Sequence, residues 1–235
     1  MGYNDVCDCE DLCNCSVAEP VSIKNYGPQA KQFRIYDQGP IKSSGNRGLD
    51  QLHVVITAID PGGTTGWSQL MLPRVLYNRD IFSYPVDAIL ANKLRWEHGE
   101  FDTSTDEDLM AWHVYDRVVA RYASGPVIIE DFILRPERKE KSRELLSPVR
   151  LTAKIEAHMW LANRKAFFQS PADAKRMTNS RLGAMNCLVS DGMPDHARDA
   201  DRHVVLFLRK CLGVQGAINR RSAWPHIYGK CAGFA

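Results

Sequence analysis

The chain has 235 residues, of which 44% are hydrophobic and 25% are charged, and its formal net charge is +2. This length suffices for one substantial core with extensions. No run of about 18 apolar residues is present, and the start lacks the basic and then apolar pattern of a signal peptide, so we expect a cytoplasmic protein with no membrane partner.

Residues 1–50 are predicted to form a flexible N-terminal extension, because they lack hydrophobic periodicity and are interrupted by Pro and Gly. Four of the seven cysteines stand here, in the array Cys7-x-Cys9-x3-Cys13-x-Cys15. Four thiolates can bind zinc, but structural zinc sites usually use Cys-x2-Cys pairs, and the neighbouring acids would raise the thiol pKa values. A metal site and an acidic tail with free thiols both remain open.

The stretch from Val54 to Ile59 is apolar or β-branched at every position, which is typical of a central strand buried on both faces. The strand runs directly into Asp60, and a turn rich in glycine follows it. Gly62, Gly63 and Gly66 would allow another backbone, a phosphate or a metal to come close. An ordinary hairpin whose Asp only caps a turn is the alternative.

The chain then predicts an antiparallel meander that ends with a short third strand within Arg74–Ser83. A helix follows between residues 104 and 122, with capping residues at its start and Gly125-Pro126 after its end. Its apolar residues recur at helical spacing: Leu109, Trp112, Tyr115, Val119 and Tyr122. Val127–Phe132 is a second apolar strand that ends in carboxylates. Since a strand reached through a crossover helix lies parallel to its predecessor, Glu130 is expected near Asp60, and we prefer it to Asp131 because it directly follows the apolar run.

A charged loop follows from residue 134 to residue 145, and we expect it to lie beside the site. Its basic residues are candidates for holding the phosphate backbone of a nucleic acid, although its glutamates make a self-neutralised loop the alternative. A helix is predicted from Ser147, a strand at Ala166–Gln169, and short helices after Ser170 and Asn179. The candidate DNA-binding residues are Arg138, Lys139, Lys141, Arg143, Lys175 and Arg176.

A final helix from Asp195 to Leu208 carries the third polar cluster. At helical spacing, its apolar stripe is bordered on one side by His196, Asp199 and His203, and on the other by Asp201. Acids in a first helical turn are also favoured by the helix dipole alone. The stripe consists of Ala197, Ala200, Val204, Phe207 and Cys211.

These elements in this order resemble the ribonuclease H-like nuclease fold, an α/β architecture with a central mixed five-stranded sheet, an antiparallel meander followed by parallel strands, flanked by helices. Ala58-Ile59-Asp60-Pro61-Gly62 followed by Thr65-Gly66 is similar to the opening motif of RuvC-like Holliday junction resolvases. Ser170-Pro171-Ala172-Asp173-Ala174-Lys175 and the His-x-x-Asp helix are most similar to the type found in actinobacterial phages. The resemblance covers residues 51–212 and leaves residues 1–50 and a C-terminal tail, 213–235, without a counterpart.

By this resemblance, Asp60, Glu130, His196 and Asp199 are the catalytic and metal-binding residues. Two Mg²⁺ ions, for which Mn²⁺ can substitute, can activate the water and stabilise the charge in phosphodiester hydrolysis. Such hard cations prefer carboxylate oxygens. The implied substrate is branched DNA, a four-way junction cut by paired nicks. Because one active centre makes one nick, we expect a homodimer. If the gene belongs to a phage, the protein acts in the cytoplasm of the bacterial host.

Three alternatives accompany this prediction. A related nuclease can act on RNA–DNA hybrids or flaps with the same acids. The Asp-Pro-Gly-Gly-Thr-Thr-Gly turn also resembles the first phosphate loop of actin-like and Hsp70-like ATPases, but those proteins need a second such domain and a second phosphate loop. A non-catalytic DNA-binding protein is disfavoured by the presence of all three acids.

Overall fold

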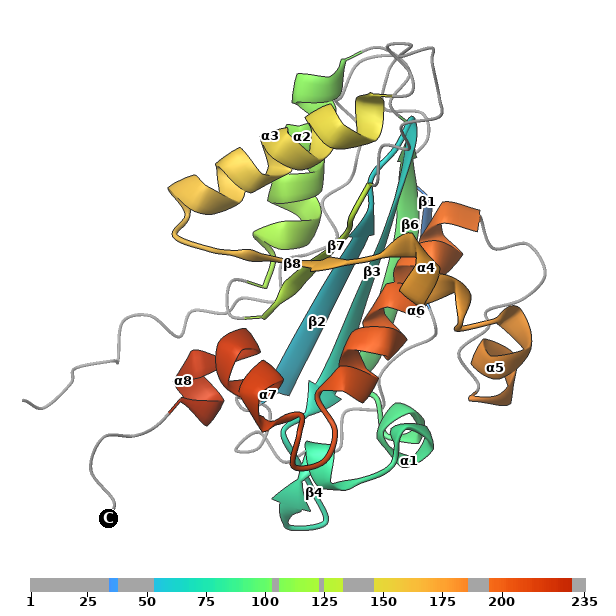
Figure 1. Cartoon of the computed structure of the whole chain (residues 1–235), viewed down its shortest axis with the longest axis vertical. Helices are drawn as coiled ribbons and strands as arrows, with labels where there is room; N and C mark the ends of the chain where they lie inside the picture. Colours follow the sequence, from blue (N-terminus) through green and yellow to red (C-terminus); the bar gives the residue numbers. More distant parts are fainter. Residues whose placement is uncertain are drawn as a thin grey trace, which may run out of the picture. The chain divides into compact units, whose positions relative to one another are not determined.

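The computed structural model describes residues 34–37, 53–102, 106–122, 125–132, 146–185 and 195–229, which lie in the larger of two compact units of the chain, Gln32–Ala235. A mixed sheet of six strands has the order β1-β6-β3-β2-β7-β8 (Figure 1). Its strands are β1 (Arg34–Asp37), β2 (His53–Asp60), β3 (Thr64–Pro73), β6 (Arg95–Asp102), β7 (Val127–Glu130) and β8 (Ala166–Gln169).

The predicted topology is confirmed. β2, β3 and β6 form an antiparallel meander, β7 pairs parallel with β2, and β8 pairs parallel with β7. This is the ribonuclease H-like arrangement that the sequence predicts. One strand is added to the expected five, because β1, from the segment predicted to be a flexible extension, pairs antiparallel with β6.

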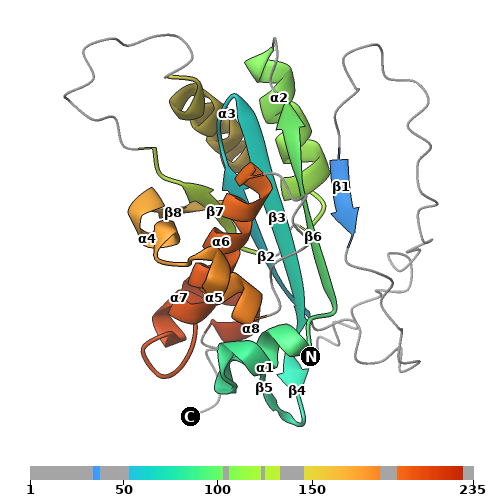
Figure 2. The ribbon, with the colours of Figure 1, turned by 90° about the vertical axis from the view of Figure 1, so that its right-hand side faces the viewer.

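Helices cover both faces of the sheet, and side chains alternate between two apolar cores. Ile59, Val127 and Ile129 face α2 and α3, whereas Ala58 and Ile128 face α6. α6 lies along β3 and β2 (Figure 2). The helices are α1 (Val86–Ala91), α2 (Glu107–Val114), α3 (Ser147–Leu161), α4 (Pro171–Lys175), α5 (Asn179–Ala184), α6 (Asp195–Lys210), α7 (Ala217–Ala223) and α8 (Pro225–Tyr228), with a 3-10 turn η1 (Ile81–Ser83) and a π-helical turn η2 (Tyr115–Val119).

The prediction of the third meander strand within Arg74–Ser83 is wrong. That segment forms a hairpin of β4 (Val75–Leu76) and β5 (Arg79–Asp80), and its two turn residues, Tyr77 and Asn78, have positive φ angles of 46° and 63°. The third strand is β6. Its pattern escapes notice because two of its buried side chains, Glu97 and His98, are polar.

The helix predicted between residues 104 and 122 is present, but its buried face differs from the expected one. Asp106 caps α2 by accepting hydrogen bonds from the backbone N–H groups of residues 108 and 109. Leu109 and Trp112, which recur at helical spacing, are exposed, while Met110 and Val114 are buried. The predicted spacing continues past Val114 into the π-helical turn, where the angle per residue changes, so residues before and after this turn do not share one face.

The segment expected to be a C-terminal tail supplies α7, α8 and a buried tryptophan. Trp224 donates a hydrogen bond from Nε1 to the carbonyl oxygen of Val55 over 3.3 Å. Its ring packs against Phe82, with ring centroids 5.3 Å apart. Residues 213–229 therefore contribute to the core on the α6 face. In the described part of the chain, no helix has the length and apolar character needed to span a membrane.

Candidate active site

Asp60 stands where β2 ends, and only 8% of the residue is exposed. Its Oδ2 lies 2.9 Å from Nδ1 of His196, on α6. Burial raises the pKa of Asp60 above its usual value, the hydrogen bond with His196 opposes this, and the charges of Glu130 and Asp199 add to the increase. Asp60 is therefore a buried acid surrounded by other acids, which is typical of functional sites.

The first turn of α6 is held against the sheet by a close backbone approach at Gly66. Asp60 and Gly66 are paired residues of β2 and β3. A Cβ atom at Gly66 would lie only 2.0 Å from the carbonyl oxygen of His196. The expectation that the glycine-rich turn admits a close neighbour is therefore met at Gly66, and the neighbour is the backbone of α6.

Glu100, on β6, binds the same end of α6; it lies on the side of β3 opposite to Asp60. It pairs with Gly66 across β3 and β6, and its Oε1 accepts hydrogen bonds from the backbone N–H groups of His196 (2.9 Å) and Ala197 (3.2 Å). A carboxylate at this position satisfies N–H groups that a helix cannot satisfy internally, and it complements the helix dipole. The sequence analysis missed Glu100 because β6 was not predicted.

Glu130 ends β7 beside Asp60, since Ile59 and Ile129, the residues before them, pair in parallel register. Its Oε2 lies 2.7 Å from Nε2 of His203. The adjacent Asp131 is exposed. The structure thus places Glu130, the preferred acid of the pair, on the face that α6 covers.

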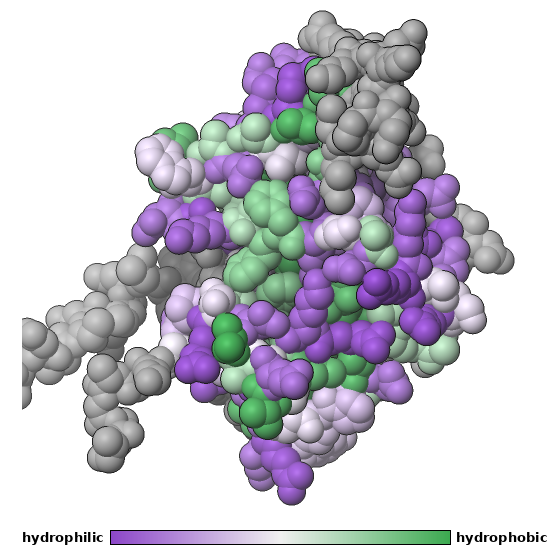
Figure 3. Space-filling view, in the orientation of Figure 1, coloured by the Kyte–Doolittle hydropathy of each residue, from purple (hydrophilic) through white to green (hydrophobic). Residues whose placement is uncertain are grey.

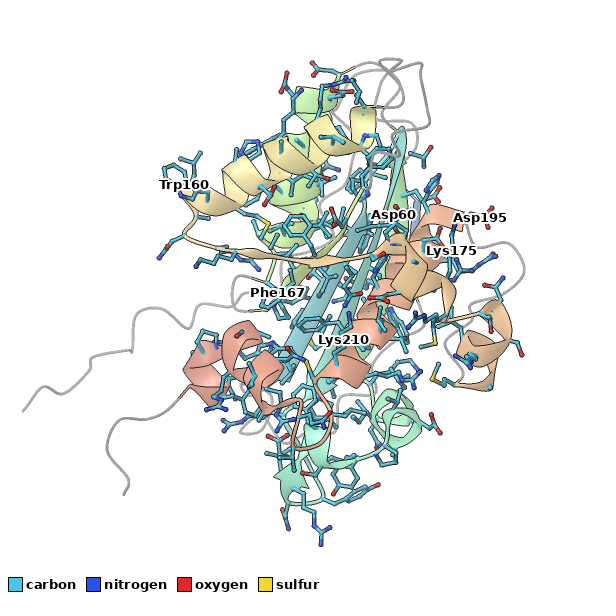
Figure 4. All side chains as sticks on the ribbon, in the orientation of Figure 1. Asp60, Trp160, Phe167, Lys175, Asp195 and Lys210 are labelled. Carbon is cyan, nitrogen blue, oxygen red and sulfur yellow. The ribbon has the colours of Figure 1, made fainter. Side chains whose placement is uncertain are left out.

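Asp199 lies on α6 one turn after His196. Its charge contributes to the raised pKa values of both Asp60 and His196, so it is electrostatically coupled to the other site residues. Its carboxylate forms an ion pair with Arg202, which also donates a hydrogen bond to Asn179. Figure 4 shows Asp60 near the end of α6 that begins with Asp195.

Each of the three acids is thus paired with a donor from the same helix: Asp60 with His196, Glu130 with His203, and Asp199 with Arg202. In the conformation described, no three acidic, histidine or cysteine side chains of the described residues are arranged to hold a metal ion. The donor set itself fits a hard divalent cation in its chemistry, because three carboxylates, two of which act electrostatically on the buried Asp60, offer hard oxygen ligands. A cation would also offset the repulsion that adds to the raised pKa of Asp60.

Asp201, on the opposite border of the apolar stripe, belongs to a different network. Only 1% of it is exposed, and its Oδ1 accepts hydrogen bonds from Ser68 Oγ (2.6 Å) and Trp96 Nε1 (3.0 Å). Nδ1 of His98 lies 3.4 Å from its other oxygen. The predicted stripe of five residues is confirmed as buried. Asp201 therefore anchors α6 on the sheet, away from Asp60.

We expect Asp201→Ala to lower the free energy of unfolding by about 3 kcal/mol, because it removes the buried acceptor of the Ser68 hydroxyl and one of the two acceptors of Trp96 Nε1. Chemical denaturation measures this. The matched control is Asp195→Ala on the same helix, whose side chain is 90% exposed and whose ion pair with Arg198 should contribute less than about 1 kcal/mol. A stable but inactive Asp201→Ala variant would contradict the assignment of Asp199, and not Asp201, to the site.

The remaining candidate residues divide into two groups. Lys175 and Arg176 are exposed, at the end of α4, which packs against α6. The loop residues Arg138, Lys139, Lys141 and Arg143 lie outside the described residues, as does the cysteine array. Of the remaining cysteines only Cys211 is described; it is buried, and burial raises its pKa to about 12, so its thiol is unreactive.

Solved structures that are similar to this chain include two of Thermus thermophilus RuvC. No family model matches the chain, and no curated protein matches it. RuvC of Thermus thermophilus in complex with a Holliday junction substrate has a TM-score of 0.46 at 13% identity, over 73% of this chain and 98% of that chain. Thermus thermophilus RuvC alone has a TM-score of 0.45 at 13% identity, over 67% of this chain and 95% of that chain. Neither similarity bears on the chemistry of this chain.

Proposed function

We propose that the protein is a divalent-metal-dependent endonuclease that cuts branched DNA, and that it resolves four-way junctions by paired nicks. One observation carries the proposal: Asp60, at the end of β2, is buried and hydrogen-bonded to His196, and its pKa is raised by burial and by the charges of Glu130 on β7 and Asp199 on α6. The similarity of the Asp60 motif to the RuvC-like resolvases, and of the His-x-x-Asp helix to their phage type, supplies the substrate class.

Asp60, Glu130 and Asp199, with His196, would hold two Mg²⁺ ions. Bound there, the ions would activate a water molecule and stabilise the charge that develops on the phosphate. The protein's own part is to fix the ligands. Asp60 is held rigidly by a central strand, Glu130 by the strand beside it, and the first turn of α6 is fixed by Gly66 and Glu100.

The turn after Asp60 favours a nuclease over a phosphate-binding ATPase. In a phosphate loop, glycines leave room for the phosphate and free backbone N–H groups bind it. Here the space at Gly66 is filled by the backbone of His196. The N–H group of Gly62 donates to Thr65 Oγ1 over 3.3 Å, within the turn itself.

Incubation of the purified full-length protein with a synthetic four-way junction and Mg²⁺ tests the proposal. We expect symmetric nicks that require Mg²⁺ or Mn²⁺ and are absent with EDTA. Linear duplex, flap and RNA–DNA hybrid substrates run in parallel identify the preferred substrate. Cleavage of hybrids or flaps alone would assign the protein to another class of ribonuclease H-like nuclease. No cleavage of any substrate with either metal would refute the proposal.

The DNA surface is proposed to include Lys175 and Arg176 together with the four basic loop residues. The surface over α4 to α6 is largely hydrophilic (Figure 3), and the Arg176 side chain is 81% exposed. Affinity for the junction should fall with salt, with a slope near −0.9 for each phosphate neutralised on a duplex arm.

Changing Lys175 and Arg176 to Gln should therefore reduce the magnitude of this slope by about 0.9 for each phosphate that the variant no longer neutralises. Fluorescence anisotropy across a salt series, with Ca²⁺ in place of Mg²⁺, measures it. The control is Arg79→Gln, an exposed cation in the β4–β5 hairpin. Figure 1 labels β4 at one end of the ribbon, far from the position of Asp60 that Figure 4 labels in the same orientation. A second variant neutralises the four loop residues. Slopes equal to the wild-type value in both variants would place the DNA surface elsewhere.

We further propose that two copies bind one junction, because paired nicks require two active centres. Analytical ultracentrifugation of the Asp60→Asn variant with a junction in Mg²⁺ keeps the DNA intact during the measurement. We expect a complex of two chains with one junction. A single chain on each junction at saturation would contradict the proposal.

A further inference from the structure

Glu130 and Gln169 are the last residues of the adjacent parallel strands β7 and β8, and they are paired in register. Side chains at the same register of parallel strands project from the same face of the sheet, which here is the face covered by α6. His203, on the third turn of α6, lies over both of them. Its side chain is completely buried. Glu130, Gln169 and His203 therefore lie together at the edge of the site.

Both ring nitrogens of His203 face a side chain. Nε2 lies 2.7 Å from Glu130 Oε2, and Nδ1 lies 3.0 Å from Gln169 Oε1. Gln169 is only 3% exposed, and its amide nitrogen has no hydrogen-bond partner among the described residues. Rotating the amide by 180° would give that nitrogen a partner in Nδ1. In that orientation Nδ1 accepts from the amide, and Nε2 of the neutral ring carries the hydrogen that Glu130 accepts.

The partner of Glu130 differs from the partners of the other two acids. The side chains of His196 and Arg202 are 46% and 20% exposed, so each can turn away from its acid into solvent. The His203 ring is 0% exposed and cannot leave without opening the core. His203 therefore stays bound to Oε2 of Glu130, and Oε1 is the oxygen that this hydrogen bond leaves available to a ligand.

We propose that His203 and Gln169 are positioning residues, which orient Glu130 for a divalent cation by holding its Oε2 and fixing the side-chain torsions. Hydrogen bonds to a ligating carboxylate set its orientation, and their loss typically weakens metal affinity about 10–100-fold. This inference deepens the proposed function and rests on it for the identity of the bound group. This arrangement also explains a buried histidine that would otherwise be only a polar residue in an apolar core.

Binding of Mn²⁺ alone, without DNA, tests the proposal, because free Mn²⁺ is counted directly by electron paramagnetic resonance. Mn²⁺ prefers oxygen ligands, so cysteine thiols contribute little. We expect His203→Leu and Gln169→Leu to weaken Mn²⁺ binding about 10–100-fold. His203→Gln, whose amide nitrogen can reach the position of Nε2, should recover part of the affinity. The part of the Mn²⁺ binding that is lost in Asp60→Asn is the part that occurs at the site.

The matched control is Gln69→Leu. Gln69 is also 3% exposed, but its amide nitrogen donates to Thr57 Oγ1 and to the carbonyl oxygen of Val118, on the opposite face of the sheet. This variant should lose stability to a similar degree, measured by thermal unfolding, and keep the wild-type Mn²⁺ affinity. Equal losses of affinity in Gln69→Leu and Gln169→Leu would show that the effect is general destabilisation and would overturn the inference.

Wild-type affinity in His203→Leu, or no Mn²⁺ binding by the wild-type protein, would equally overturn it. Failure of the proposed function has a different signature. A wild-type protein that binds Mn²⁺ at the Asp60 site and cuts no DNA substrate would refute the nuclease proposal. The comparison of affinities would still support the positioning role of His203 and Gln169 in that case.

Discussion

Replacement of Asp60 with Asn is expected to abolish cleavage, by at least about 10³-fold, while the protein remains folded. The carboxylate is the central charged ligand of the proposed metal site, and Asn keeps its shape and removes its charge. The folded state meanwhile benefits, because a charge buried beside Glu130 and Asp199 is removed. Without divalent cations, we therefore expect the variant to be at least as stable as the wild type. Single-turnover cleavage and chemical denaturation in EDTA measure the two effects.

The pH dependence of stability provides a second check on Asp60. Its pKa is raised in the folded state, so the folded protein binds more protons than the unfolded chain between the usual value of 3.8 and the raised value. In EDTA the stability contributed by this group therefore falls as pH rises through that window. The difference in unfolding free energy between variant and wild type should grow over the same range. A variant that is less stable than the wild type at neutral pH, or one that still cuts, would contradict the assignment.

Gly66→Ala is expected to impair both stability and cleavage, although Gly66 has no side chain that could take part in catalysis. The added methyl group would lie 2.0 Å from the carbonyl oxygen and 2.7 Å from the N–H nitrogen of consecutive residues in the first turn of α6. Backbone cannot rotate away as a flexible side chain can, so the helix must shift from β3. We expect a loss of about 3 kcal/mol in unfolding free energy, at the upper end of overpacking effects.

The cleavage rate of Gly66→Ala should fall by more than its loss of folded protein can explain, because His196 and Asp199 move with the helix. Displacements of about 1 Å in a catalytic site can reduce rates on the order of 100-fold. Cleavage is measured well below the melting temperature. Gly62→Ala is the control, since its nearest contact is 3.0 Å, with Thr64 O in the same turn. If Gly66→Ala cuts at the wild-type rate, the close packing of α6 on β3 is not needed for activity.

Asp60 could be identified as a site residue from the sequence, whereas the neighbour of Gly66 could not. A carboxylate directly after a buried apolar strand is a local pattern, and it located both Asp60 and Glu130. The glycine after Asp60 indicated a close approach, but not by which segment. Only the packed structure identifies the first turn of α6 as that neighbour.

Helical periodicity was reliable where one face of a helix packs against the sheet over its whole length. The stripe of α6 is buried as predicted, and the spacing places Asp199 towards Asp60. In α2 the same method selected Leu109 and Trp112, which are exposed. There the helix continues into a π-helical turn, and a uniform 100° per residue no longer describes it.

The sequence by itself therefore determined that β2, β7 and β8 are strands, where β2 and β7 end, and the polar border of α6, because each depends on patterns within a few neighbouring residues. The tertiary structure alone decided the partners of the acids. Glu100, His203 and Gln169 reach the site from β6, α6 and β8, and Asp201 is bound by Ser68 and Trp96. Hydrogen bonds between residues this far apart in the chain depend on strand order and register, which no local pattern encodes.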